Sequence, residues 1–368
     1  MSRSTRGRLS AAIASMSLIV IAIAGCGSSS SSSGAGGSGG GSSSGKKTYN
    51  IYLSNSYLGE GWRTQMVKSV QAVLTHSPLK GRADLTVVNS DQNTPSSQIA
   101  SLNNIILKKP DAIVIDPSSP PALQPVLQRA CDQHILVVAL DQPVNASCAY
   151  NVHMDFKTIG QETAGWLAKT LHGKGAIFVD QGLPGSTVST DLMTGYMSVI
   201  KQNPGISVAA KFTSQFAPGP EQQAVASLLS AHPDVSGVIS QGYVSGSFSA
   251  FKNAGHKLVP FAAFGYNGPM SDCATQSGAT CFLATDPPWQ SASALKVAID
   301  VLDGKSEPKD QVLPSQCFST NRVSPAGETC DAIKVGQNTF PKLSPGIVFP
   351  VSPPWTSPPL TVHEATGL

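Results

Sequence analysis

The chain has 368 residues, with 25 Lys and Arg against 22 Asp and Glu. Three of the arginines and none of the acids lie in residues 1–26, so the rest of the chain carries 22 formal charges of each sign. A zero net charge argues against a nucleic-acid or anionic-membrane partner, because both are bound through an excess of Lys and Arg. The sequence pI of about 8.4 therefore reflects the first 26 residues.

Residues 1–26 have the pattern of an export signal. Three arginines precede an apolar run from Leu9 to Ala24, which is short and rich in Ala and Ser for a membrane span. The run ends in Ile23-Ala24-Gly25-Cys26, which resembles the lipobox of bacterial lipoproteins. This resemblance implies cleavage before Cys26 and a diacylglyceryl group on its thiol. The alternative is an ordinary signal peptide with a chance cysteine.

Residues 27–46 are expected to form a tether. Up to Gly45 they are almost wholly Ser and Gly, which bury no apolar area and resist ordering. About twenty such residues reach roughly 25 Å on average. That length lifts a folded domain off a membrane surface without fixing its orientation.

The body of the chain, about 320 residues, is long enough for two compact domains. Short Val- and Ile-rich runs without polar alternation predict strands that helices cover on both faces. The segments between them have helical period, as in Glu221–Ser230 and in the segment after Pro95. This alternation predicts an α/β fold with parallel sheets. The predicted strands include Tyr49–Leu53, Leu85–Val88, Ile113–Ile115, Ile135–Leu140, Ile177–Val179, Val235–Ile239 and Pro260–Phe264.

Polar residues follow most of these strands directly. Ligands of parallel sheets bind beyond the carboxyl ends of the strands, so these residues are candidates for a binding site. Bonding to local backbone or capping of the next helix would explain about half of them. The clusters are Asp116-Pro117, Asp141-Gln142, Asp180-Gln181-Gly182, Gln241-Gly242 and Asn267-Gly268.

Six cysteines remain after Cys26, an even number that suggests disulfides in an exported chain. Six cysteines allow fifteen pairings. Their grouping into near neighbours favours three short loops. A metal site is the alternative, but the chain has no Cys-x-x-Cys and no His at a suitable spacing. The favoured pairs are Cys131–Cys148, Cys273–Cys281 and Cys317–Cys330.

Several local patterns occur in the order known from one protein family. They are a strand within Lys109–Pro117, a strand within Ile135–Asp141, and a Gly-rich turn at Gln181–Ser186. Ala231–Val235 and Phe264–Gly268 follow. Together they resemble the periplasmic ribose/galactose-type (type I) sugar-binding proteins, which are substrate-binding components of ABC importers. The match covers residues 48–305.

The resemblance implies two Rossmann-like lobes with parallel sheets, hinged by three crossovers. The N-terminal lobe would comprise residues 47–153 plus 287–312, and the C-terminal lobe 154–286 plus 313–368. The crossovers are expected near residues 151–155, 286–288 and 312–314. The Pro-rich tail from Gln316 onward exceeds the usual length of the family, and the sequence assigns it no function.

Sugar binding needs aromatic rings that cover the C–H faces and polar groups that bond the hydroxyls. Carried over position by position, the family implies an aromatic role for Trp62, with Tyr57 as a substitute ring. Core packing is the alternative for both Trp62 and Phe216. The full expected ligand-binding set is Tyr57, Trp62, Asp141, Gln142, Phe216, Tyr243, Tyr266, Asn267 and Asp286.

The chain departs from the family at both arginines that commonly clamp a sugar. Gln142 stands at one position and Leu192 at the other. Gly242-Tyr243 likewise replaces an Asn-Asp pair. These changes predict a neutral, aromatic pocket that disfavours strongly anionic ligands. A less polar sugar, a glycoside or an aromatic metabolite remains an alternative to a common sugar.

The resemblance therefore implies an exported, non-enzymatic lipoprotein, held on the outer face of the bacterial cell membrane by Cys26. It would bind a small neutral ligand, a sugar by resemblance, and deliver it to an ABC permease and ATPase. We expect a monomer without cofactor or metal. A sensory receptor that presents its ligand to a membrane kinase or chemoreceptor is the main alternative.

Catalysis is the remaining alternative. The body of the chain has no Gly-x-Ser-x-Gly elbow, phosphate-binding loop or His-Glu-x-x-His motif. A glycosidase would need two acids across one cleft, for which Asp141 and Asp286 are the candidates.

Overall fold

The computed structural model describes residues 46–59, 61–322 and 329–368. The expected export signal, the lipid-anchor cysteine Cys26 and most of the tether lie outside these residues. Within the described residues, no helix is long and apolar enough to cross a membrane.

The described residues form two sheets, and the first has six parallel strands in the order β11-β5-β4-β3-β1-β2. Its central strand β3 is buried along its whole length, as expected for a strand covered on both faces. The strands are β1 (Tyr49–Asn55), β2 (Ala83–Asn89), β3 (Ala112–Asp116), β4 (Leu136–Asp141), β5 (Tyr150–His153) and β11 (Asp310–Val312).

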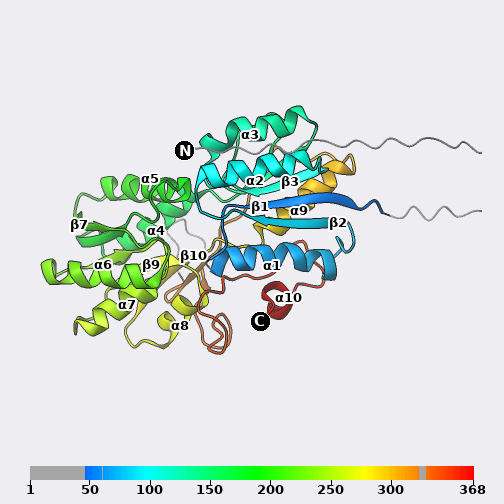
Figure 1. Ribbon diagram of the computed structural model, residues 1–368. Helices are drawn as coiled ribbons and strands as arrows, with labels where there is room; N and C mark the ends of the chain where they lie inside the picture. The colour runs from blue at the N-terminus through cyan, green and yellow to red at the C-terminus, as the bar shows by residue number, and fades with distance from the viewer. Residues whose placement is uncertain (1–45, 60, 323–328) are drawn as a thin grey trace, which may run out of the picture. The chain divides into compact units, whose positions relative to one another are not determined.

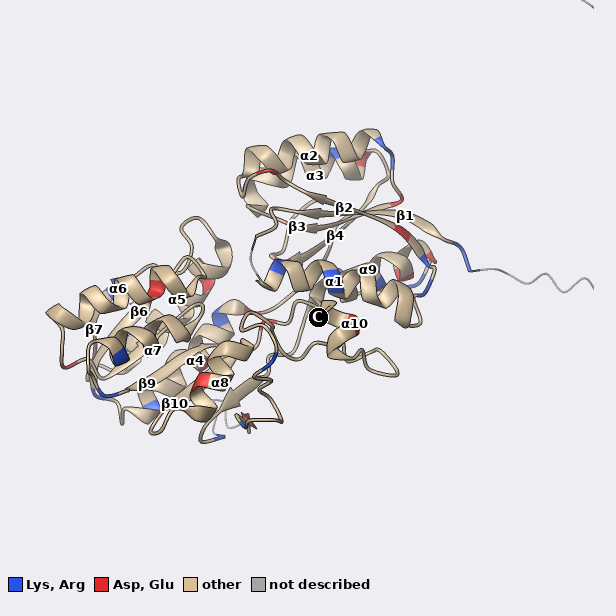
Figure 2. Ribbon diagram, turned by 60° about the horizontal axis from the view of Figure 1, so that its bottom comes forward, with Lys and Arg blue, Asp and Glu red and all other residues tan. Residues whose placement is uncertain are grey.

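Helices cover both faces of this first sheet (Figures 1 and 2). Side chains alternate along a strand. Ile113 and Ile115 of β3 therefore join the core beneath α2 and α3, whereas Val114 joins the core beneath α1 and α9. The helices are α1 (Gly61–His76), α2 (Pro95–Leu107), α3 (Pro120–Asp132) and α9 (Gln290–Leu302).

The second sheet repeats this plan, with its described strands in the order β13-β12-β10-β9-β8-β6-β7. All pairs are parallel except β10 with β12. The strands are β6 (Gly175–Asp180), β7 (Ile206–Phe212), β8 (Gly237–Ile239), β9 (Pro260–Phe264), β10 (Thr280–Ala284), β12 (Cys317–Ser319) and β13 (Asp331–Ala332). The helices are α4 (Phe156–Thr170), α5 (Thr187–Gln202), α6 (Pro218–Ala231), α7 (Val244–Asn253) and α8 (Asn267–Thr275).

The chain passes between the sheets three times before the tail, after β5, after β10 and after β11. These passages fall where the sequence predicts crossovers, and the predicted α/β fold with two parallel sheets is confirmed. Leu192, at an expected arginine position, is fully buried. It lies where α4 meets α5, since a Cβ on Gly160 would come 2.4 Å from the Leu192 carbonyl oxygen.

The sequence-based boundaries assign the whole tail, residues 313–368, to the second lobe. In the structure, part of the tail contacts the first lobe instead. Strands β12 and β13 do join the second sheet, but helix α10 (Val362–Thr366) contacts α1 of the first lobe (Figure 1). Trp355 Nε1 also donates to Ser293 Oγ of α9, 3.0 Å away. Apolar residues explain this return, because Leu360 and Ala365 are buried.

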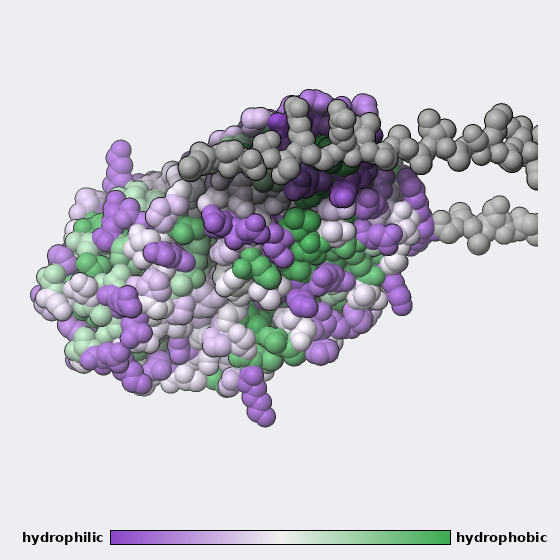
Figure 3. Space-filling view, viewed as in Figure 1, coloured by the Kyte–Doolittle hydropathy of each residue, from purple (hydrophilic) through white to green (hydrophobic). Residues whose placement is uncertain are grey.

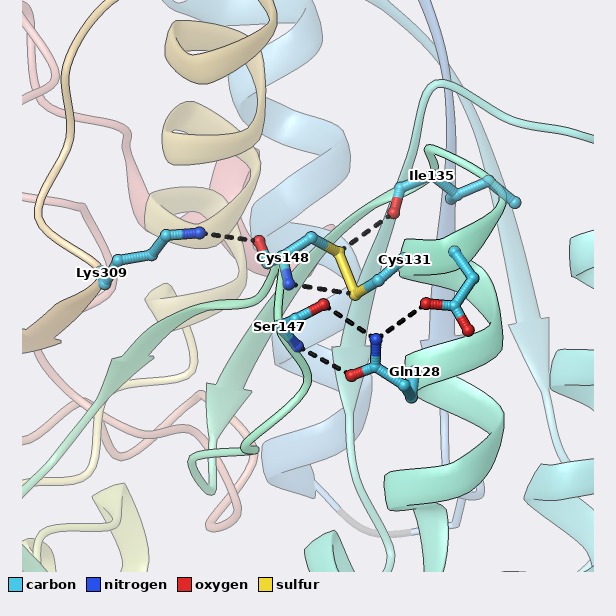
Figure 4. The surroundings of a disulfide bond; sticks show 7 residues. Gln128, Cys131, Ile135, Ser147, Cys148 and Lys309 are labelled. Atoms are coloured by element: carbon cyan, nitrogen blue, oxygen red, sulfur yellow. Dashed lines mark hydrogen bonds between the residues drawn. A yellow bond between two sulfur atoms is a disulfide. The ribbon is translucent and has the colours of Figure 1, made fainter.

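The described residues contain three disulfide bonds, and they are the three pairs that the spacing favours. Figure 4 shows the surroundings of Cys131–Cys148, which joins the end of α3 to the loop before β5. Gln128 supports this loop by donating to Ser147 Oγ and accepting from the Ser147 amide. Closing a loop of this length stabilises a fold by about 3 kcal/mol.

Charged residues of both signs are scattered over the described surface and form no single-sign face in Figure 2. On the face shown in Figure 3, hydrophobic residues form small separate groups among hydrophilic ones. Neither view shows a concentrated charged or apolar surface.

The second lobe completely buries the carboxylic acid of Glu221. Glu221 of α6 accepts a hydrogen bond of 2.5 Å from Ser247 Oγ of α7. Burial raises its pKa well above the ordinary 4.5. Above about pH 4.5 the unfolded chain therefore releases a proton that the folded chain keeps. As the pH rises, this group lowers the free energy of unfolding.

Glu221→Gln should make the free energy of unfolding less dependent on pH above about 4.5. Relative to the parent, the variant should gain up to about 1.4 kcal/mol per pH unit until the pH reaches the folded-state pKa. Urea unfolding between pH ~5 and ~7 measures this, with the partly exposed Glu307→Gln as control. Parallel pH profiles for parent and Glu221→Gln would contradict the assignment.

Candidate functional site

A cavity of about 400 Å³ lies between the two lobes. Loops that follow the carboxyl ends of parallel strands in both sheets line it, as expected for this fold. The first lobe contributes Tyr57, Trp62, Arg63, Asn93, Pro95, Ser118, Ser119, Asp141 and Gln142. The second lobe and its crossover contribute Leu183, Pro184, Gly185, Ser186, Val188, Phe216, Gln241, Phe264, Tyr266 and Asp286.

The structure brings seven of the nine expected ligand-binding residues to this cavity and leaves two away from it. The two that do not line the cavity are Tyr243 and Asn267. The seven that do are Tyr57, Trp62, Asp141, Gln142, Phe216, Tyr266 and Asp286.

Trp62 connects the first lobe to a crossover. It is the second residue of α1, and its Nε1 donates to the backbone oxygen of Asp286 at 2.7 Å. The side chain is 5% exposed, so its ring has a fixed place in the cavity wall. The core-packing alternative and the ligand-contact role are thus compatible, since the ring is buried and still lines the cavity.

Two lining residues hold an unusual backbone conformation. Asp141 and Phe216 have φ values of 65° and 53°, in the left-handed region that residues other than glycine rarely adopt. Such strain persists only where the surrounding structure enforces it, and it gathers at functional sites. Here it orients two side chains that the sequence places in the pocket.

Gln142 joins the lobes across the cavity. Its Nε2 donates to the Pro117 backbone oxygen at 3.0 Å, and its Oε1 accepts from the Thr187 hydroxyl at the start of α5. The amide that replaces the expected arginine is therefore occupied by protein partners on both sides. It acts as an interlobe contact in this structure.

Arg63 is a cavity residue that the sequence analysis missed. Its guanidinium forms an ion pair with the fully buried Asp116 and donates to Asn55 Oδ1 at 3.1 Å. It also lies 4.7 Å from the centre of the Tyr57 ring. The cavity thus contains an arginine despite the loss of both expected ones, and Asp116 balances its charge. The signal was its place beside Trp62 in the first turn of α1.

Asp180 holds the loops of the second lobe together. Its carboxylate accepts from the backbone amides of Gly182, Ser214 and Gln241, each within 2.9 Å. Burial raises its pKa, although these hydrogen bonds act in the opposite direction. The three amides follow β6, β7 and β8, so one carboxylate fixes three walls of the cavity.

Two buried oxygen atoms of the cavity residues have no hydrogen-bond partner among the described residues. They are Gln241 Oε1 and Ser118 Oγ, one from each lobe. Buried polar atoms are nearly always paired in proteins. Neither residue belongs to the expected ligand-binding set, although Gln241 lies in one of the strand-end polar clusters that are candidates for a binding site.

Tyr243 and Asn267 do not line the cavity, and both lie beside the tail. The Tyr243 ring stacks on Tyr266 with 4.2 Å between ring centres, so it supports a lining residue. Asn267 Nδ2 contacts the backbone oxygens of Phe340, Leu343 and Ser344, and its Oδ1 accepts from the Phe340 amide. In this structure the tail occupies the side-chain amide of Asn267, which was expected to bind the ligand.

With this geometry the chain is a two-lobed binding protein with an interlobe site, and sequence comparison gives its family. Residues 51–306 match the model of the periplasmic binding protein domain, and the chain belongs to that family. The ribose import binding protein of Bacillus subtilis is 23% identical over 273 residues, covering 73% of this chain and 86% of its own length. The galactofuranose-binding protein of Escherichia coli is 25% identical over 207 residues, covering 54% and 64%.

Solved structures agree with this assignment. An ABC transporter solute binding protein from Thermobispora bispora is 30% identical, with a TM-score of 0.64 over 73% of this chain and 84% of its own. The binding component of the arabinose ABC transporter from Shewanella has a TM-score of 0.67 at 22% identity, covering 74% and 92%. The second likeness concerns the fold alone.

Thr187→Val should weaken the interlobe contact, because it removes the hydroxyl that donates to Gln142 while keeping the shape. The loss of about 1 kcal/mol should favour a wider average cleft. Small-angle X-ray scattering should show a larger radius of gyration than for the parent. Thr190→Val is the matched control, since that hydroxyl bonds within α5, to the Ser186 oxygen. Equal radii for parent and Thr187→Val would rule out this contact as a determinant of closure.

Proposed function

We propose that the chain is an extracytoplasmic solute-binding lipoprotein that binds a small neutral ligand, a sugar, between its lobes and delivers it to an ABC permease. One observation carries the proposal. Two aromatic rings, Trp62 and Tyr266, line the cavity, and two other lining residues, Gln241 and Ser118, each hold a buried oxygen without a partner among the described residues. Rings cover the C–H faces of a sugar, and hydroxyl groups pair with such oxygens.

The charges at the cavity support a neutral ligand over an anionic one. Arg63 lies in the wall, but its guanidinium is matched by the buried Asp116. Asp141 and Asp286 add two carboxylates. An anionic sugar would enter a site whose acids outnumber its cations, which opposes binding in a partly desolvated cavity.

Relatives support the class of ligand and the transport role. The curated relatives include proteins named for ribose, galactofuranose and xylitol, and the Thermobispora bispora structure is an ABC transporter solute binding protein. These relatives are binding proteins, in keeping with a chain that carries its ligand unchanged. Ligand held by both lobes would favour the closed form, and that form would dock on the permease.

Mass spectrometry of the ligand that the purified protein retains, followed by thermal-shift assays with sugars and aromatic glycosides, tests this function. Trp62→Ala should weaken binding of the identified compound by about 2 kcal/mol or more, roughly thirtyfold in Kd. Trp355→Ala is the control, since that ring lies outside the cavity. Unchanged affinity in Trp62→Ala, or stabilisation by acidic compounds only, would contradict the proposal.

Lipid anchoring on Cys26 is the second part of the proposal, and it concerns residues outside the described ones. We expect the mature chain to begin at Cys26 and to carry a mass increase that corresponds to a diacylglyceryl group. Cys26→Ser should shift the protein from the membrane fraction to the soluble fraction after export. A membrane-bound Cys26→Ser protein would contradict lipid anchoring but leave the binding site untouched.

A further inference from the structure

The tail contains a segment, residues 340–348, that contacts both lobes; we call it the strap. Its second-lobe anchor is Asn267, at the start of α8. Besides the side-chain contacts described above, the Asn267 amide donates to the Ile347 oxygen at 2.7 Å. The next amide, that of Gly268, donates to the Pro345 oxygen at 2.9 Å. Asn267 is 2% exposed, so this anchor is shielded from water.

The first-lobe anchor is Gln65 of α1. Its Nε2 donates to the Val348 oxygen and its Oε1 accepts from the Val348 amide, both at 2.8 Å. This side chain thus replaces a partner strand for one residue of the strap. Gln65 is 4% exposed, and removing it would leave two buried backbone groups of Val348 unpaired.

The two anchors leave no slack between the lobes. The second lobe is bound to Ile347 and the first to Val348, which are consecutive residues. Consecutive Cα atoms are about 3.8 Å apart whatever the backbone conformation of a trans chain. While both anchors hold, Gln65 and Asn267 therefore cannot move apart, and the lobes can only rotate about this point.

Close backbone contacts surround the same point. A Cβ on Gly61 would come 2.8 Å from the Gly346 oxygen, and a Cβ on Gly346 would come 3.1 Å from the Tyr243 hydroxyl. Tyr266 pairs with Val348 in an antiparallel bridge. The strap therefore touches the first residue of α1 and both stacked tyrosines of the second lobe.

We propose that the strap is the pivot of the hinge and that Gln65 and Asn267 are positioning residues for the binding site. Gln65 lies one helical turn after Trp62, and Asn267 follows Tyr266 directly. Rotation about the strap changes the distance between these two rings less than it changes distances between groups that lie farther from the strap. The strap thus holds Trp62 and Tyr266 near their places in the site before any ligand enters.

Gln65→Leu releases the first-lobe anchor and tests the pivot without any ligand. Small-angle X-ray scattering of the full chain should give a larger radius of gyration than for the parent, because the lobes can then separate at this end. Hydrogen exchange of the Val348 amide should become faster by about fivefold or more, as expected when its hydrogen bond is lost. Asn267→Leu releases the other end and should enlarge the radius in the same way, which provides the test should Gln65→Leu fail to fold.

Trp355→Phe is the matched control. It removes a hydrogen bond between the tail and the first lobe. Trp355 lies seven residues beyond Val348 and outside the strap, so this bond does not join the two lobes. Its radius of gyration and its Val348 exchange should equal those of the parent. The proposal is overturned if folded Gln65→Leu or Asn267→Leu keeps the parental radius, or if Trp355→Phe expands as much as they do. Neither result depends on which ligand the cavity binds.

Discussion

Parallel strands end at one edge of a sheet, and in this chain the loops beyond that edge of both sheets line a single cavity. Each lobe alone offers half a site. The order of the strands therefore determines where the side chains that line the cavity lie. This order is the same in the two lobes, since β5-β4-β3-β1-β2 corresponds to β10-β9-β8-β6-β7. Strand order thus determines the approximate place of each loop, and contacts between side chains determine its detailed conformation.

Buried acids fix the conformation of several of these loops, and the acid of each lobe has a different kind of partner. Asp180 gathers three backbone amides of the second lobe, whereas Asp116 holds the guanidinium of Arg63 in the first. Buried charges are costly unless they are paired and hydrogen-bonded. These partners keep the loops rigid, and the cavity therefore presents a preformed wall to a ligand. The strained backbone at Asp141 and Phe216 is consistent with such rigidity.

The sequence predicted the elements that depend on local pattern. Buried central strands such as β3 and β4 have continuous apolar runs, and the disulfide pairs follow from close spacing. The short strand β5, the edge strand β7 and the buried strand β10 are absent from the predicted strands; in β5 and β7 polar residues break the apolar run. The tail could not be predicted, because its turns and prolines have no period and its partners are far away in the chain.

The same tail contacts the two expected ligand-binding residues that do not line the cavity. Asn267 and Tyr243 have the residue types of ligand contacts, but the Asn267 side chain bonds to Phe340, and Tyr243 lies next to Gly346. Arg63 is the converse case, because it lines the cavity and was not expected there. The resemblance implies arginines at two other positions, whereas Arg63 comes from α1 and lies in the cavity wall beside its partner Asp116.

The central claim is that one small neutral ligand is held by both lobes at this cavity. A crystal structure of the protein with the compound that stabilises it most tests the claim directly. We predict electron density between the lobes, in contact with Trp62 from the first and with Gln241 from the second. Density confined to one lobe, or located outside the cavity, would contradict the account.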